Sequence, residues 1–240
     1  MWTDVSGFDR GDRVTTTGTY NFDPALGSLV IDAFGNCGVR RTELTAQHMD
    51  DARFASNLIT ARWAASGVNL WTVDLQSVAL IQGQASYSVP SDTIFILDAY
   101  ITQGSPAIDT LIYPISRSDY VAISDKATQA TPSVFWFDRT LSPTVTLWAV
   151  PSQTGMWTLN YWRARQIQDS ALSNGATVEM PIRFVDAFSW ELSARMAVKY
   201  APDRAAMLKA EAKEAWLVAI SSDTENVELQ IQPTLAGYFR

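Results

Sequence analysis

The segment from 44 to 73 changes from helical to extended patterning at a single glycine, and this change constrains the possible folds more than any other feature. Thr45 is a good N-cap, because its side-chain oxygen can accept a hydrogen bond from a first-turn amide. Apolar residues then recur at helical spacing (Met49, Ala52, Ala55, Leu58, Ile59 and Trp63), which predicts a helix over 45–66 with one buried face. Gly67 is expected to take the left-handed conformation that ends many helices. The chain therefore passes directly from a capped helix into extended structure.

A β-rich segment follows this glycine. From residue 70 to 165 the chain contains no glutamate and one lysine, Lys126, and it is rich in the β-branched and aromatic residues that suit a pleated, half-buried surface. Ser116 and Asp119 have the spacing of a capping box and predict a short helix within the segment. Seven strands are predicted, over 72–80, 85–89, 94–101, 108–113, 133–138, 144–149 and 156–164.

Helices are predicted on both sides of the β-rich segment. The first spans 25–34. Near the other end, Pro181 is expected in the first turn of a helix that continues to Tyr200, and Pro202 separates it from a helix over 203–220. The helix after Pro181 carries Phe184, Phe188, Leu192 and Met196 on one face, as a buried helix would.

Helices from the two ends are expected to pack together, which we infer from the order of the elements and from the preference for short connections. The sequence thus predicts an α+β fold, in which a discontinuous helical domain carries an inserted antiparallel β-rich domain of sandwich or barrel type and ends in an extended C-terminal arm. The predicted divisions are an N-terminal extension at 1–23, the first helical part at 24–70, the β-rich domain at 71–180, the second helical part at 181–222 and the arm at 223–240.

The two chain ends differ from the body. Residues 1–23 are polar and show no helical periodicity, which suits either an arm that docks on a neighbour or a loose end. In the C-terminal arm, Val227, Leu229 and Ile231 alternate with polar residues as in an isolated strand. Such an edge can pair with another chain, so the arm is a candidate contact with a partner.

Few residues suggest catalysis. His48 falls in the first turn of the helix after Thr45, where a capping or surface role is expected, and no nucleophile-elbow or phosphate-binding motif accompanies it. Cys37 and one histidine cannot build a zinc site of the usual kind, and a buried, inert thiol is expected. Acidic pairs such as Asp50 and Asp51 could serve a hydrolase, although they are expected to favour the helix start electrostatically. No catalytic residue, metal site or cofactor is predicted.

Charge and hydropathy narrow the possible partners. The net charge of −7 argues against a protein that holds nucleic acid by its overall field, although it is compatible with the wall of a DNA conduit. No apolar run reaches the length of a membrane span, and the N-terminus lacks the pattern of a secretion signal. A single cysteine fits a reducing compartment. A membrane partner is not expected.

Tryptophan and arginine supply the remaining candidate contacts. Trp136, Trp148, Trp157 and Trp162 lie in the later strands, where they either fill a core or interface or, if exposed together, bind sugar rings. The chain has fourteen arginines and four lysines, and arginine suits interface ion pairs and phosphate contacts. The candidates for subunit-interface or DNA-channel contacts are Arg40, Arg41, Arg163 and Arg165.

An ordered set of segments resembles the head-to-tail adaptor proteins of tailed bacteriophages, also called packaged-DNA stabilisation proteins, tail accessory factors or tail tubular protein A. The resemblance covers roughly residues 24–232 in the order expected for the family. Its segments are the helix at 25–34 with Gly38-Val39-Arg40, the capped helix leading into Gly67–Val73, the run from Tyr113 to Tyr120 with Lys126, Pro132 and Leu147–Pro151, and the run from Pro181 to Ala187 with Leu192, Ala197, Lys199, Tyr200 and Pro202. The extension at 1–23 departs from the family pattern.

The resemblance implies a structural, non-enzymatic virion protein made in the host cytoplasm. By that analogy, about twelve copies form a ring under the portal protein, extend the channel for double-stranded DNA without reading its sequence, help to retain the packaged genome and dock the tail nozzle or tail tube protein. The C-terminal arm would reach the portal, which adds Tyr238, Phe239 and Arg240 to the candidate contacts. Two other hypotheses are an aromatic-rich β module that binds carbohydrate and a cell-wall hydrolase.

Overall fold

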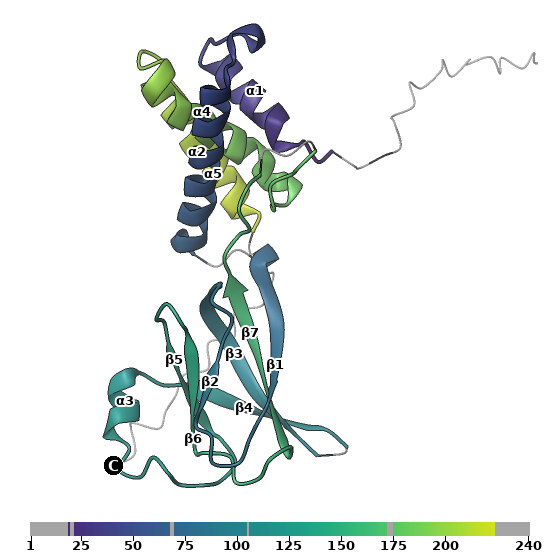
Figure 1. The fold of residues 1–240 in the computed structure, drawn as a ribbon, viewed down its shortest axis with the longest axis vertical. Helices are drawn as coiled ribbons and strands as arrows, with labels where there is room; N and C mark the ends of the chain where they lie inside the picture. Colours follow the sequence, from purple (N-terminus) through teal and green to yellow (C-terminus); the bar gives the residue numbers. More distant parts are fainter. Residues whose placement is uncertain (1–18, 20–21, 68–69, 105, 172–174, 224–240) are drawn as a thin grey trace, which may run out of the picture.

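The computed structural model describes residue 19 and residues 22–67, 70–104, 106–171 and 175–223. The longer α-helices gather at one end of the molecule, and the strands lie at the other end together with the short helix over 117–122 (Figure 1). The α-helices are α1 (Leu26–Asn36), α2 (Ala46–Ser66), α3 (Arg117–Ala122), α4 (Val185–Tyr200) and α5 (Ala205–Ser221), with 3-10 turns η1 (Arg41–Glu43), η2 (Leu70–Thr72) and η3 (Ile182–Phe184). The strands are β1 (Val73–Ala79), β2 (Ser86–Ser88), β3 (Thr93–Gln103), β4 (Ile108–Pro114), β5 (Val134–Asp138), β6 (Thr144–Trp148) and β7 (Trp157–Arg165).

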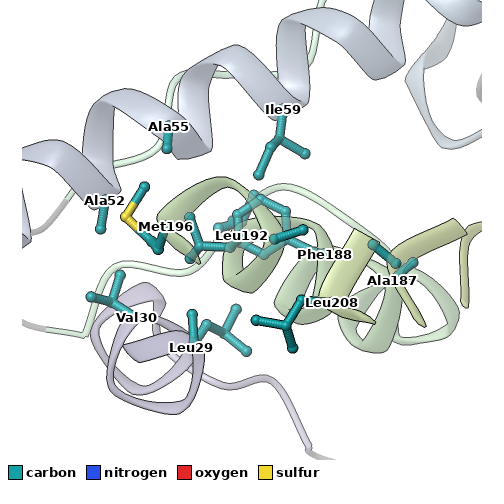
Figure 2. Close-up of a cluster of buried hydrophobic side chains, with 14 of the residues drawn as sticks. Leu29, Val30, Ala52, Ala55, Ile59, Ala187, Phe188, Leu192, Met196 and Leu208 are labelled. Carbon is teal, nitrogen blue, oxygen red and sulfur yellow. The ribbon is translucent and has the colours of Figure 1, made fainter. Parts of the chain in front are cut away.

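Helix α4 is the centre of the helical region, because α1, α2 and α5 all pack against it (Figure 2). Its predicted apolar face is confirmed: Phe184, Phe188, Leu192 and Met196 are all buried. Many of the residues that meet these side chains are alanines, which allow helices to approach closely. The core includes Ala52, Ala55, Ala187, Ala194, Ala197, Ala212 and Ala219.

Polar contacts fix α1 against α4. The Ser189 hydroxyl donates to Asp32 at 2.6 Å, and the Asn36 amide donates to the Ser193 hydroxyl at 3.1 Å. The thiol of Cys37 lies 3.5 Å from the Ser193 carbonyl oxygen, and burial raises the pKa of this thiol. Cys37 is therefore a buried thiol held in its less reactive, protonated form.

Helix α2 begins as predicted, with the Thr45 side chain accepting a hydrogen bond from the His48 amide. Two details of its prediction are wrong. Leu58 lies on the outward side of the helix and is 43% exposed, because the buried stripe follows Ala52, Ile59 and Trp63 instead. Gly67 has φ 162° and ψ −170°, which is extended backbone. The helix therefore ends at Gly67 without the left-handed conformation that was predicted there.

The strands form one curled, mixed sheet in the order β1-β7-β3-β4-β5-β6-β2. All seven predicted strands are present, with ends shifted by one or two residues. The strands pair antiparallel, as predicted, except that β4 and β5 pair in parallel through Tyr113 with Val134 and Pro114 with Phe135. Residues 115–133, which include α3, provide the long connection that parallel strands require.

The two faces of the sheet differ. One face encloses a second core, and the largest fully buried side chains there are Leu80, Ile101, Ile112, Phe135, Leu147 and Tyr161. On the other face, a chain of polar contacts crosses four strands. Ser77 donates to Asn160 at 2.6 Å, Asn160 donates to Thr102 at 2.8 Å, and Thr102 donates to Asp109 at 2.6 Å. Core packing on one face and hydrogen bonding on the other together fix the register of these strands.

The helical and β-rich regions thus have separate hydrophobic cores. Two stretches connect them, one from Gly67 to η2 and the other from the end of β7 to η3. The division of the chain into an inserted domain and a discontinuous helical domain stays a prediction, which the two cores support.

Candidate functional site

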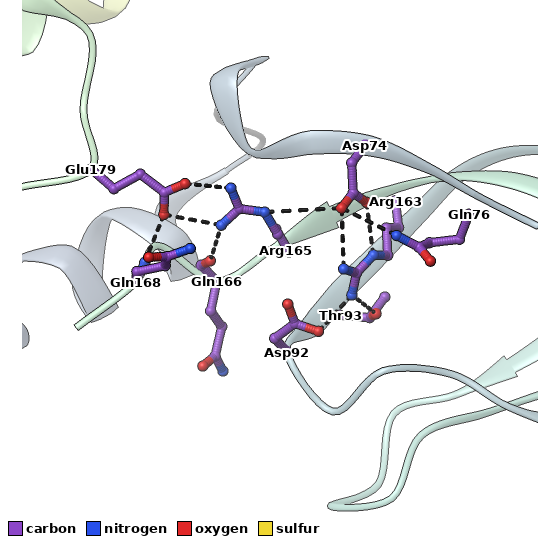
Figure 3. Close-up of polar contacts among 9 residues, drawn as sticks. All are labelled: Asp74, Gln76, Asp92, Thr93, Arg163, Arg165, Gln166, Gln168 and Glu179. Atoms are coloured by element: carbon purple, nitrogen blue, oxygen red, sulfur yellow. Dashed lines mark hydrogen bonds and ion pairs between the residues drawn. The ribbon is translucent and has the colours of Figure 1, made fainter.

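The candidate arginines of β7 lie where the sheet meets the connection to the helices (Figure 3). The guanidinium of Arg163 is almost fully buried. It donates to Asp74 at 2.7 Å, to Asp92 at 2.5 Å and to the Thr93 hydroxyl at 2.8 Å. Burial opposes the charge of Arg163, but the hydrogen bonds from this guanidinium to Asp74 and Asp92 outweigh it, so the pKa of Arg163 lies above its ordinary value.

Arg165 continues the same network toward η3. Its guanidinium makes two hydrogen bonds to the Glu179 carboxylate and one to the Gln166 carbonyl oxygen at 3.1 Å. Glu179 also accepts from the Gln168 amide at 2.9 Å, and its pKa is lowered chiefly by the Arg165 hydrogen bonds. This bidentate pair joins the end of β7 to the segment that precedes η3. We call Asp74, Asp92, Arg163, Arg165 and Glu179 the junction network.

The junction network satisfies both arginines within the chain. An interface or DNA-channel role for Arg163 and Arg165 stays a prediction, and these intrachain partners make them weaker candidates than exposed arginines would be. Arg40 and Arg41 are exposed at η1, beyond the end of α1, and make no ion pair among the described residues. The structure therefore separates the four predicted arginines into two unrelated groups.

The predicted contact residues of the C-terminal arm, Val227, Leu229, Ile231, Tyr238, Phe239 and Arg240, lie outside the described residues. The position from which the arm leaves is described. The Asp223 carboxylate is nearly buried, accepts a hydrogen bond from the Leu70 amide at 3.2 Å and pairs with Arg183. The arm thus starts beside η2, where the chain enters β1.

The four tryptophans of the later strands do not share a surface. Trp157 is buried in the β-region core, and Trp136 stacks on Tyr120 with ring centroids 5.5 Å apart. The Trp148 indole donates to the Asp125 carbonyl oxygen, whereas Trp162 is 41% exposed on the outer face of β7. An exposed, coplanar set was the feature expected of a carbohydrate-binding module, and these rings do not form one.

Residues expected to signal catalysis have structural partners. His48 accepts a hydrogen bond from the Thr45 amide, and its ring lies 4.7 Å from that of Tyr200. The Tyr200 hydroxyl donates to Asp51 at 2.5 Å, which raises the pKa of Tyr200 to about 12. Among the described residues, no three His, Cys, Asp or Glu side chains form a group that could hold a metal ion. None of the described helices combines the length and the apolar character that crossing a membrane requires.

Sequence reasoning missed a basic groove of about 470 Å³ between α2, α4 and α5. Arg62, Arg195, Lys209 and Lys213 surround it, and Glu191 is the single acid among its lining residues. Glu191 pairs with Arg62 at 2.5 Å and with Arg195 at 3.4 Å. The two lysines lie four residues apart on α5, a spacing that places them on one helix face. That spacing was visible in the sequence, but the arginines of the other two helices were not linked to it.

Comparison with known proteins identifies the family. A family model described as SU10 adaptor protein matches residues 32–228, which takes in α2, the whole sheet, α4 and α5. The chain matches no curated protein. The chain belongs to the SU10 adaptor protein family, a family of phage head-to-tail adaptors. These adaptors are structural components of the virion and not enzymes.

Proposed function

We propose that this member of the SU10 adaptor family assembles as a ring beneath the portal protein of a tailed bacteriophage. The ring extends the DNA channel, helps to retain packaged DNA and docks the tail nozzle or tail tube protein. Twelve copies per ring are expected from the family resemblance. The observation that carries the proposal is the family match, because it runs continuously through both helical segments and the sheet between them.

The mechanism consists of surface complementarity, since no bond is made or broken. Each copy would use two different faces to contact its two neighbours, and rotation would close the ring. Contacts between free subunits would be weak, so that rings form on the portal and not in solution. Adjacent sites on the portal would raise the effective concentration of neighbouring subunits and drive assembly.

The C-terminal arm is proposed to reach the portal through Val227, Leu229, Ile231, Tyr238, Phe239 and Arg240. It starts at Asp223, whose carboxylate is held in place by the hydrogen bond from the Leu70 amide and by the ion pair with Arg183. A strand that leaves from a fixed point loses less conformational freedom when it pairs with a partner. Arg40 and Arg41 are proposed to contact a neighbouring subunit or the DNA backbone, because both are exposed.

The test is to measure the mass and particle shape of the purified chain, alone and mixed with its cognate portal, by light scattering and negative-stain microscopy. We expect a monomer alone and a ring stacked on the portal in the mixture. A chain that stays monomeric and leaves the portal unchanged would contradict the proposal.

A variant that ends after Asp223 tests the arm separately. We expect it to fold, because the described helices and strands are complete without residues 224–240, and to bind the portal at least tenfold more weakly. Portal binding equal to that of the full chain would exclude the arm as the main contact while leaving ring formation itself in place.

A further inference from the structure

Opposite the basic groove, the helical region carries an acidic face with an apolar centre. Phe22 and Ile182 are 66% and 58% exposed and line the same hollow between α1 and the start of α4. Asp32 and Asp186 line it too, and Asp23 adjoins Phe22. We call these five residues the acidic face. Exposed large apolar side chains framed by like charges are typical of an interaction surface.

We propose that the acidic face of one copy binds the basic groove of the next copy. This inference rests on the proposed ring and names the two surfaces that form it. Phe22 and Ile182 would enter the groove, whose apolar lining includes Ala194, Val198 and Trp216. Phe22 and Ile182 supply the aromatic and aliphatic anchors, and the groove supplies the concave site, as in a well-packed interface core.

Charge complementarity selects a second copy as the occupant. Four cations and one acid surround the basic groove, whereas the acidic face has three carboxylates, although the chain as a whole has a net charge of −7. Among the described residues, Lys209 and Lys213 make neither an ion pair nor a hydrogen bond. Both lysines are therefore available to carboxylates from another molecule. Opposite potentials on two faces of the same chain favour contact between copies and fix its direction.

The two surfaces can be used at the same time, because they lie on opposite sides of α4. Glu191, Ala194, Arg195 and Val198 face the groove, whereas Ser189 and Ser193 face α1 through their hydrogen bonds to Asp32 and Asn36. Asp186 and Arg195 are nine residues apart, which is two and a half turns and places them on opposite faces. Each copy can therefore bind one neighbour on each side. A contact between two different surfaces is heterologous and builds a ring or a filament, not a closed dimer.

Charge reversal on each surface tests the pairing. The groove variant is Lys209→Glu/Lys213→Glu, and the face variant is Asp23→Lys/Asp186→Lys. Rings on the cognate portal are counted by negative-stain microscopy, and folding is checked by circular dichroism. We expect each variant alone to form at least tenfold fewer rings than the unmodified chain. We expect an equal mixture of the two variants to recover ring formation, because the reversed surfaces complement each other and the unmodified surfaces still pair.

Matched controls separate this pairing from net charge. Glu211→Lys/Glu214→Lys replaces two acids with lysines, as the face variant does, but on α5 outside both surfaces. Arg53→Glu/Arg117→Glu replaces two cations with glutamates, as the groove variant does, also outside both surfaces. Both control variants should form rings like the unmodified chain. If the controls also lose rings, the loss in the reversal variants is due to net charge, and the inference is overturned. So would normal rings from either reversal variant, or a mixture that fails to recover.

A cysteine pair gives a second measurement that does not depend on charge. Lys213→Cys and Asp186→Cys variants are mixed on the portal and oxidised, with buried Cys37 as the unreactive background. We expect a cross-linked dimer in the mixture and far less in either variant alone. If rings form without this cross-link, the two surfaces do not meet and the ring proposal stands without them. If the unmodified chain never forms rings, the proposed function fails first.

Discussion

The helical and β-rich regions fill their cores in different ways. Alanines make up nine of the 23 buried residues in the helical core, where they surround the aromatic and aliphatic face of α4. The β core has one alanine among twelve buried residues and contains Phe135, Trp157, Tyr161 and Tyr87. Alanine brings helix axes together without occupying the space between them. The curled sheet instead surrounds a volume that large side chains must fill. Small side chains that let the helix axes approach one another thus distinguish the helical core, and large side chains that fill the volume inside the sheet distinguish the β core.

Charge follows the same division. Segment 70–165 has a single lysine and no glutamate, whereas the basic groove and the acidic face both belong to the helical region. Under the proposed pairing of the acidic face with the basic groove, the helical region would provide the contacts between copies, and the sheet would not take part in them. If the two regions are as separate as their cores suggest, a change in one region should leave the other intact.

The largest effect is expected from emptying either core. Phe188→Ala and Phe135→Ala each remove a ring that is almost fully buried, and each should cost about 3–5 kcal/mol. If the regions are independent, hydrogen exchange read by mass spectrometry should rise in α1, α2 and α4 for the first variant and in β5 and β6 for the second. A rise throughout the described part of the chain for either variant would show one cooperative unit and contradict the division.

Loss of the junction network should have the next largest effect. Arg163→Ala leaves Asp74 and Asp92 without their shared partner and should cost about 2–3 kcal/mol, since hydrogen bonds to charged groups are worth about 1.5–3 kcal/mol. Unfolding in urea measures this loss. Arg53→Ala is the control, because its 3.7 Å pair with Asp50 is exposed and is worth less than about 1 kcal/mol. Equal losses would remove any special role for the junction network.

A smaller, pH-dependent effect is expected at Glu179. The folded pKa of Glu179 lies below its ordinary value because Arg165 donates two hydrogen bonds to it. Its contribution to stability is therefore present above about pH 4.3 and is lost as the pH falls through the lower folded pKa. Urea unfolding of Glu179→Gln should show a shallower loss of stability between about pH 5 and pH 3 than the unmodified chain. Parallel curves would mean that the pair contributes nothing.

The smallest effect is expected at Tyr200, on the exposed side of the helical region. Its pKa of about 12 comes from the hydrogen bond to Asp51, so Asp51→Asn should return the phenol toward its ordinary value near pH 10. Ultraviolet titration of the phenolate absorbance in the folded protein measures the change. The bond stabilises the fold below about pH 10 and ceases to do so as the pH rises through the folded pKa. An unchanged titration would assign the high pKa to another cause.

Local signals in the sequence predicted the elements well, and contacts between distant residues were less accessible. The strands, the N-cap at Thr45 and the capping box at Ser116 depend on neighbouring residues, and all are present. The parallel pairing of β4 with β5 depends on where α3 returns the chain, which periodicity does not encode. Arg163 looked available in the sequence because its partner Asp74 lies 89 residues away.

The surfaces illustrate the same limit. Lys209 and Lys213 have helical spacing that sequence reasoning could have used, but Arg62 and Arg195 join them only because α2 and α5 pack on either side of α4. Phe22 fell in a segment that looked unstructured by periodicity. Its place beside Ile182 follows from the packing of α1 on α4. A surface composed of several elements cannot be read from any one of them.

The position of Asp223 has a mechanical consequence. It ties the end of α5 to η2 and η3, at the boundary between the helical and β-rich regions. A pull on the C-terminal arm would therefore load this boundary first, and the force would divide between α4 through Arg183 and β1 through Leu70.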